Sequence, residues 1–214
     1  MLPRKAIGTR WGRCSAARWR TLRAHDIPLV TLQRPPATAF YCVHDPKNFG
    51  DDVTNRRVTV PEALRTGRQI VGVELGRDAL SIFGMTPVMR DGKVLANTDI
   101  GISFGKDFVD RIKQRFGIDL AVHWTDGRSF KRLSSTFGDE VVANQEELRR
   151  VFDGAVVHRD AVLAGHPAAL YVGQIKNYAG QPISVMVASA QLKRNATALF
   201  DSVDTFLAGL RDAG

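Results

Sequence analysis

Cysteine is scarce in this chain, which has two cysteines, Cys14 and Cys42, among 214 residues. They lie far apart, and neither belongs to a Cys-x-x-Cys pair or to a Cys/His cluster. A disulfide framework needs several cysteines, and a zinc site needs ligands at short, regular spacing. The sequence therefore predicts neither a metal site nor a fold held together by disulfides.

Long hydrophobic runs are missing too. No segment approaches the roughly 18 consecutive apolar residues that a transmembrane helix requires. The basic start of the chain is not followed by the apolar stretch of about 7–15 residues that marks a signal peptide. The chain as given is thus expected to contain neither a signal peptide nor a membrane span.

Most catalytic and cofactor motifs are absent: there is no Walker A loop, no GxGxxG and no HExxH. One enzyme pattern is present, GISFG at 101–105, which matches the GxSxG nucleophile elbow of serine hydrolases. Such a hydrolase needs a mostly parallel sheet and a glycine-rich oxyanion-hole segment before the serine, and no HGGG-like stretch precedes Ser103. A strand-end serine is the favoured interpretation, so neither an enzyme nor a cofactor is predicted.

Acidic residues are missing from the first 25 positions, which carry seven of the eight net positive charges. The remainder of the chain is almost neutral. A basic arm that binds nucleic acid or an anionic membrane is one hypothesis, because clustered Lys and Arg attract phosphate. A solvated basic tail is the simpler interpretation, and no nucleic-acid partner is expected.

Hydrophobic periodicity predicts an alternation of strands and helices. Helices are expected over 15–26, 61–67, 106–116, 144–153 and, as an extended exit helix, 191–214. Strands are expected over 29–33, 38–44, 69–75, 80–89, 93–104, 118–124, 129–133, 156–162, 167–176 and 183–189. Phe108, Ile112 and Phe116 should form the apolar stripe of helix 106–116. Asn144 should cap helix 144–153.

A repeat is the most informative feature of this order. Residues 87–104 and 175–192 share the pattern of strand, polar turn with glycine, and long strand, with Gly92 and Gly180 lying 88 positions apart. Each copy is typical of a PAS-like antiparallel sheet with helices, and Asp91-Gly92 suits a tight hairpin. The predicted fold class is α+β, with two such modules in tandem.

Four segments carry a resemblance to a known family. They are PPATAFYCVHDPKNFGDDV (35–53), GRQIVGVELGRDAL (67–80), PVMRDGKVLANTDIGISFGKDFVDRIKQRFGID (87–119) and GHPAALYVGQIKNYAGQPISVMVA (165–188). In this order they resemble the double-Cache sensory domains of bacterial chemoreceptors and sensor kinases. The resemblance implies a basic segment and short helix at 1–26, a first, membrane-distal-like module at 27–104, a second, membrane-proximal-like module at 105–190, and the exit helix at 191–214.

The resemblance also implies a non-catalytic module that binds a small molecule on the periplasmic side of the inner membrane and takes part in signal transduction or chemotaxis. Such domains lie between two membrane spans, the second of which leads to an output domain. This chain shows neither, so it is expected to be a fragment of a receptor, attached to the membrane only through segments that it lacks. It departs from the family at Phe83, where arginine is common, and in the strand at 96–99.

Ligand binding is expected in the first module. The resemblance implies Arg57 and Arg77 as the anchors, because they align with family arginines that flank the first module's sheet, and arginine pairs bidentately with planar anionic groups. Glu74 and Tyr41 are the secondary candidates. The expected partner is therefore a small molecule, with an anionic one favoured by the two arginines. Tyr171 and Lys176 of the second module are the next candidates, and a homodimer is left open.

Overall fold

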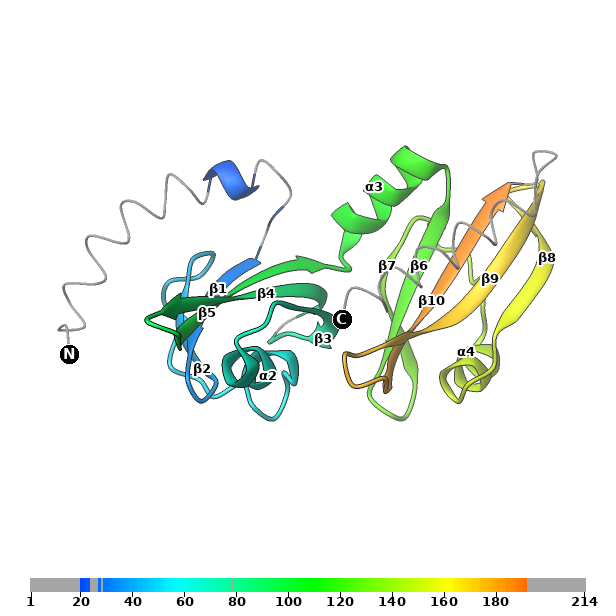
Figure 1. Ribbon diagram of the computed structural model, residues 1–214. Helices are drawn as coiled ribbons and strands as arrows, with labels where there is room; N and C mark the ends of the chain where they lie inside the picture. Colours follow the sequence, from blue (N-terminus) through cyan, green and yellow to red (C-terminus); the bar gives the residue numbers. More distant parts are fainter. Residues whose placement is uncertain (1–19, 24–26, 28, 78, 192–214) are drawn as a thin grey trace. The chain divides into compact units, whose positions relative to one another are not determined.

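Two five-stranded sheets follow one another along the chain (Figure 1). The computed structural model describes residues 20–23, 27, 29–77 and 79–191. The first sheet contains β1 (Leu29–Arg34), β2 (Thr38–Cys42), β3 (Ile70–Leu75), β4 (Leu80–Arg90) and β5 (Lys93–Ser103), with helix α2 (Thr59–Thr66) between β2 and β3. Helix α3 (Lys106–Phe116) follows β5. The second sheet contains β6 (Asp119–Thr125), β7 (Phe130–Ser135), β8 (Val157–Leu163), β9 (His166–Lys176) and β10 (Pro182–Gln191), with helix α4 (Gln145–Phe152) between β7 and β8.

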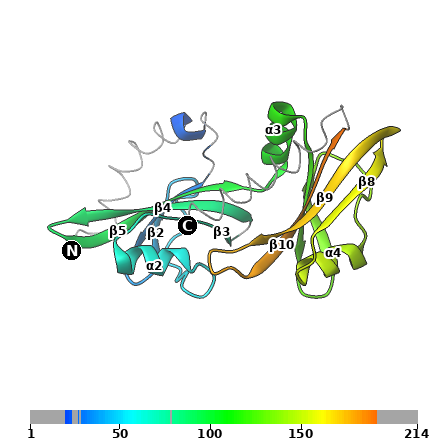
Figure 2. The same ribbon diagram turned by 45° about the vertical axis from the view of Figure 1, so that its right-hand side comes forward.

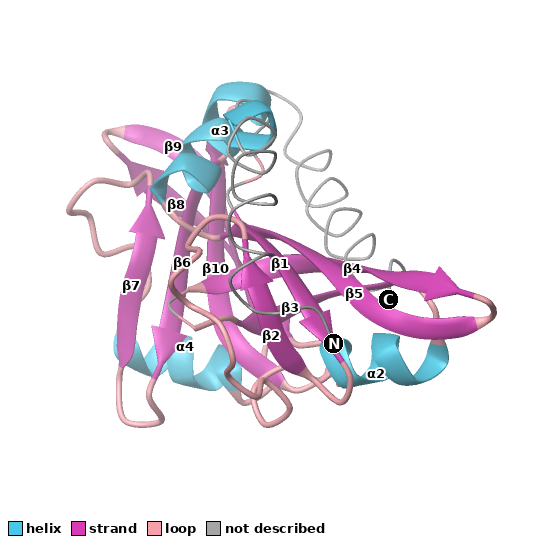
Figure 3. Cartoon of the chain, turned by 90° about the vertical axis from the view of Figure 1, so that its left-hand side faces the viewer, coloured by secondary structure: helices cyan, strands magenta, loops and turns pink. Residues whose placement is uncertain are grey.

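The two sheets have the same topology, which confirms the predicted α+β fold of two PAS-like modules. The first has the strand order β2-β1-β5-β4-β3 and the second the order β7-β6-β10-β9-β8. In each sheet, the two strands that come last along the chain form a long antiparallel hairpin, β4–β5 in the first and β9–β10 in the second. Gly92 and Gly180 lie in the two hairpin turns with φ of 73° and 79°, a backbone conformation that glycine adopts without steric cost. Figure 3 shows that strands dominate the described chain.

Residues that contact one another fall into two compact units. The first contains residues 1–71 and 81–103, and the second contains residues 72–80 and 104–214. The domain boundaries expected from the sequence, 27–104 and 105–190, stay a prediction. Of the helix expected over 15–26, residues 20–23 are described and are helical. The remainder of that helix, the basic segment before it and the exit helix after 191 lie outside the described residues.

Helices α2 and α4 occupy equivalent positions along the chain, because each follows the second strand of its module and precedes the third. Helix α2 ends as predicted at Gly67, which has φ of 66° and donates its amide to the Ala63 carbonyl at 2.9 Å. Helix α4 begins at Asn144, whose side chain accepts a hydrogen bond of 2.8 Å from the Glu147 amide, so the predicted cap is confirmed.

The prediction for α3 is wrong in one respect. Phe116 was expected to complete its buried stripe, but this side chain is 58% exposed, whereas Val109 is fully buried. Four residues turn an α-helix by about 40° more than a full rotation, so a series at strict four-residue spacing drifts around the helix. Helix α3 packs on β6 and β7, and Phe104 contacts Phe108 edge to face with ring centroids 5.0 Å apart.

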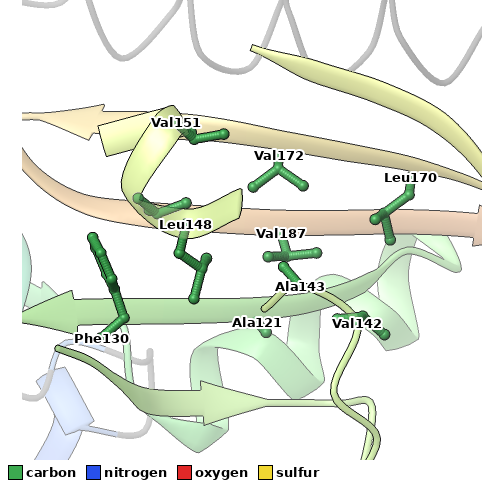
Figure 4. Close-up of a cluster of buried hydrophobic side chains, with 10 residues drawn as sticks. Ala121, Phe130, Val142, Ala143, Leu148, Val151, Leu170, Val172 and Val187 are labelled. Carbon is green, nitrogen blue, oxygen red and sulfur yellow. The ribbon is translucent and has the colours of Figure 1, made fainter. Parts of the chain in front are cut away.

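Helix α4 lies beside the strands of the second sheet (Figure 2), and the core of the second unit lies between this helix and the sheet (Figure 4). Leu148 and Val151 of α4 face β9 and β10, whose inward side chains are apolar. The buried members of this core are Ala121, Phe130, Val142, Ala143, Leu148, Val151, Leu170, Val172, Val185 and Val187. Burial of apolar surface stabilises this unit at about 25 cal/mol per Å².

Candidate functional site

A buried ion pair lies on the corresponding face of the first sheet. Arg57 precedes α2, and its Nη1 lies 3.1 Å from Oδ2 of Asp99 on β5. The two side chains are 6% and 3% exposed. Removing two charges from water costs several kcal/mol per ion, and their attraction offsets this only with good geometry and further hydrogen bonds. A buried ion pair therefore often adds little to the stability of a fold, and a functional role has to be considered.

Two amide side chains extend the pair into a polar chain. Gln33 of β1 donates from Nε2 to Asp99 Oδ2 at 2.7 Å, and Asn97 donates from Nδ2 to Gln33 Oε1 at 3.1 Å. Because a carboxylate only accepts hydrogen bonds, Asp99 fixes the orientation of the Gln33 amide, and Gln33 in turn fixes that of Asn97. This orientation leaves Asn97 Oδ1 buried, with no hydrogen bond from any described residue.

An aromatic ring supports the guanidinium. Cζ of Arg57 lies 3.5 Å from the centroid of the Phe83 ring, and Nη2 lies 3.9 Å from Sδ of Met85. Phe83 pairs with Gly101 across the β4–β5 ladder, and a Cβ atom at Gly101 would lie only 2.6 Å from the ring. Glycine at 101 therefore lets the ring lie flat on β5 beneath Arg57. We call Gln33, Arg57, Phe83, Met85, Asn97 and Asp99 the polar cluster of the first unit.

The second unit shows what this face looks like when it serves as ordinary core. The two hairpins can be aligned at their turn glycines, Gly92 and Gly180. Val185 and Val187 of β10 then take the places that Asn97 and Asp99 hold on β5. The ladders agree, because Val187 lies opposite Val172 of β9, just as Asp99 lies opposite Met85 of β4. The first unit thus buries an amide and a carboxylate where the second unit buries valines.

Among the residues predicted from sequence, Arg57 is the one that lies in the polar cluster. Glu74 is buried on β3, 2% exposed, while Arg77 lies in the exposed turn between β3 and β4. Tyr41 pairs with Leu32, whereas its neighbour Cys42 pairs with Thr31, the residue opposite Asp99. Since successive strand residues point to opposite faces, Tyr41 lies on the other side of the sheet from Asp99.

Gln33, Asn97 and Asp99 of the polar cluster were not predicted from the sequence. In β5 the polar residues Asn97 and Asp99 alternate with Thr98 and Ile100, a pattern in which the polar face normally meets water. Here that face is buried, since Asn97 is 0% and Asp99 3% exposed while Ile100 is 37% exposed. The available signal was a carboxylate two residues from a glycine on one strand face, which is too common to identify a site.

The hydrolase reading finds no support in the geometry. Ser103 ends β5 at the junction with α3, and no side-chain hydrogen bond joins it to a histidine or an acid within the described chain. Its strand pairs antiparallel with both β1 and β4. The described residues also contain no cluster of three His, Cys, Asp or Glu side chains suited to a metal ion. The basic arm lies outside the described residues, except for Arg20 and Arg23.

One buried histidine stands out in the second unit. His123 of β6 is 8% exposed, and Nδ1 receives no hydrogen bond from a described residue. Burial, together with the positive charge of nearby Arg132, lowers the pKa of His123 from 6.5 to about 4. The imidazole is therefore neutral at physiological pH. It lies opposite Val185 in the sheet, so it is the counterpart of Gln33.

Comparisons with known proteins agree with this architecture. A family model, dCache_3, described as a double sensory domain of two-component sensor kinase, matches residues 1–191. A search of curated protein sequences gives no significant match. None of the helices in the described part of the chain has the length and hydrophobicity of a membrane span.

Solved structures of sensory domains show similarity at low sequence identity. The ligand-binding domain of the Campylobacter jejuni chemoreceptor Tlp3, in complex with L-valine, has 10% identity and a TM-score of 0.48, covering 89% of this chain and 76% of its own. The extracellular domain of the putative histidine kinase rpHK1S-Z16 has 14% identity and a TM-score of 0.45, covering 82% and 76%. The ligand-binding domain of the Pseudomonas fluorescens chemoreceptor CtaA, in complex with L-isoleucine, has 13% identity and a TM-score of 0.42, covering 82% of this chain and 73% of its own.

Proposed function

Because the chain belongs to the double-Cache family of sensory domains, we propose that its first unit recognises a small polar molecule at the polar cluster. The observation that carries this proposal is the contrast between the two units. At equivalent places on equivalent strands, one unit buries Asn97 and Asp99 and the other buries Val185 and Val187. The fold therefore does not need an amide and a carboxylate at these two positions.

The cost in stability of the buried ion pair also supports a binding role for the polar cluster. Replacing a buried ion pair by packed apolar residues is often neutral or stabilising, by about 1–4 kcal/mol. A module that keeps Arg57 and Asp99 therefore gives up stability relative to one built like the second unit. Such losses are common where binding needs particular polar groups. Sensing is the function that would account for them.

The proposed role is binding without chemistry on the ligand. Double-Cache sensory domains are ligand-binding modules, and the ligand would act by binding one conformation of the first unit more tightly than another. We place the domain on the periplasmic side of the inner membrane, as part of a chemoreceptor or sensor kinase. In this role Arg57 is the principal contact. Glu74, which is buried on β3, stays a separate candidate, as do Arg77 and Tyr41.

A thermal-shift screen of small acids, amines, amides and amino acids on the full chain tests the proposal. A ligand that binds only the folded state at 100 times its dissociation constant stabilises it by about 2.7 kcal/mol. Asp99→Asn keeps the shape of the side chain and removes its charge, so it should change the affinity of any ligand that binds at the polar cluster. Val187→Ile, at the counterpart position, is the control and should leave the affinity unchanged. A screen in which nothing stabilises the chain would count against a working sensor.

A further inference from the structure

The ligand class can be narrowed from the atoms that the polar cluster leaves to be satisfied. Asn97 is 0% exposed, and its Oδ1 accepts no hydrogen bond from the described residues. A buried acceptor left unsatisfied costs about 1–3 kcal/mol. The amide cannot relieve this by rotating, because Nδ2 would then leave Gln33 Oε1, to which it donates at 3.1 Å.

The charge balance of the cluster points the same way. The guanidinium of Arg57 already lies 3.1 Å from the carboxylate of Asp99, and both side chains are more than nine-tenths buried. An anionic ligand would bring a second negative charge close to Asp99, with Arg57 shared between the two. Like charges in a desolvated site repel strongly, so such a ligand would be disfavoured.

Resting on the proposed function, we propose that the ligand presents an N–H or O–H donor to Asn97 Oδ1 and carries no net negative charge. Amines, amides and polyols belong to this class, and simple carboxylates do not. The sequence favours an anionic ligand on the basis of Arg57 and Arg77, but in the structure Asp99 already neutralises Arg57. Asn97 becomes the residue that sets specificity, since valine at the counterpart position, Val185, offers a ligand no acceptor.

A matched set of small probes tests the inference. Butyrate, butyramide and butylamine share a carbon skeleton and differ in charge and donors, so each is titrated into the full chain by calorimetry and thermal shift at constant ionic strength. We expect stabilisation by the amide or the amine and none by the carboxylate. Stabilisation by butyrate alone would overturn the inference and leave the proposed function standing. If neither these probes nor the wider screen bound, the proposed function would fail, and the inference with it.

Two substitutions on one strand sharpen the test. Asn97→Leu removes the acceptor and should weaken the preferred probe at least five-fold. Thr98→Val, on the opposite face of β5, is the control and should leave the dissociation constant within two-fold. Asn97→Asp adds a carboxylate of the same shape and should shift preference from butyramide toward butylamine. Equal affinities in the wild-type chain and the Asn97→Leu chain, with both chains folded by circular dichroism, would contradict a role for Oδ1.

Discussion

The ion pair between Arg57 and Asp99 can be replaced as a unit by the residue types that build a core. The perturbation is Arg57→Met together with Asp99→Val, the second change copying Val187 of the other unit. The two single variants, Arg57→Met and Asp99→Val, are compared with the double variant. If the pair is buried as its 6% and 3% exposed side chains indicate, the single and double changes should have very different effects.

The expected magnitudes follow from charge burial. Removing one partner leaves an uncompensated charge in a desolvated site, which costs about 3–5 kcal/mol of unfolding free energy. Removing both charges eliminates that cost and leaves the Gln33 amide, which donates to Asp99 at 2.7 Å, without its acceptor. That loss is about 1–3 kcal/mol. The double variant should therefore be more stable than either single variant, and strongly non-additive.

Urea unfolding of the wild-type chain, the two single variants and the double variant measures this cycle. The double variant should also fail to respond to any ligand that stabilises the wild-type chain, although it is folded. Additive losses, with the double variant the least stable of all, would refute the reasoning, because they would mean that Arg57 and Asp99 stabilise the fold independently.

Three further predictions concern packing, protonation and capping. Gly101→Ala should destabilise the first unit by about 1–3 kcal/mol, because its Cβ would meet Phe83 at 2.6 Å, and Phe83→Leu should restore much of the loss in a urea titration. His123 has a folded pKa of about 4 against 6.5 when unfolded, so unfolding takes up a proton between these values. Stability should accordingly fall by up to about 3 kcal/mol as pH drops from 7 to 4, and His123→Gln should flatten that profile; an unchanged profile would assign the acid sensitivity elsewhere. Asn144→Ala should cost about 1 kcal/mol by removing the cap on the Glu147 amide, and a thermal midpoint equal to that of wild type would contradict the cap.

Much of the architecture was accessible from the sequence, because its signals are local. Alternation over five to eleven residues marks a strand, and Asp91-Gly92 selects a tight turn through positive φ at both positions, 50° and 73°. Gly67 and Asn144 mark helix ends through the hydrogen bonds that they make within one turn. Each of these preferences acts between near neighbours, so the order of elements and the tandem repeat could be predicted.

The site could be predicted only in part. Arg57 was predicted as a ligand anchor because arginine pairs bidentately with planar anionic groups, and that role stays a prediction. Its partner Asp99 lies 42 positions away in the sequence, and Gln33 lies on another strand. Whether the polar or the apolar face of β5 is buried depends on which element covers it, and no local pattern encodes that choice. The prediction of the buried stripe on α3 was wrong for a related reason. The packing of this helix on β6 and β7 buries Val109 and leaves Phe116 exposed.

The sequence by itself determined the strands, turns and caps of two matching modules, because short-range sterics and hydrogen bonding specify them. Only the tertiary structure decided that the modules differ in what they bury. The covered face of one sheet carries Asn97 and Asp99, and that of the other carries Val185 and Val187. The physical reason is that a buried charge persists only when distant segments bring its partner to it, and Arg57 reaches Asp99 only once the loop before α2 folds onto β5.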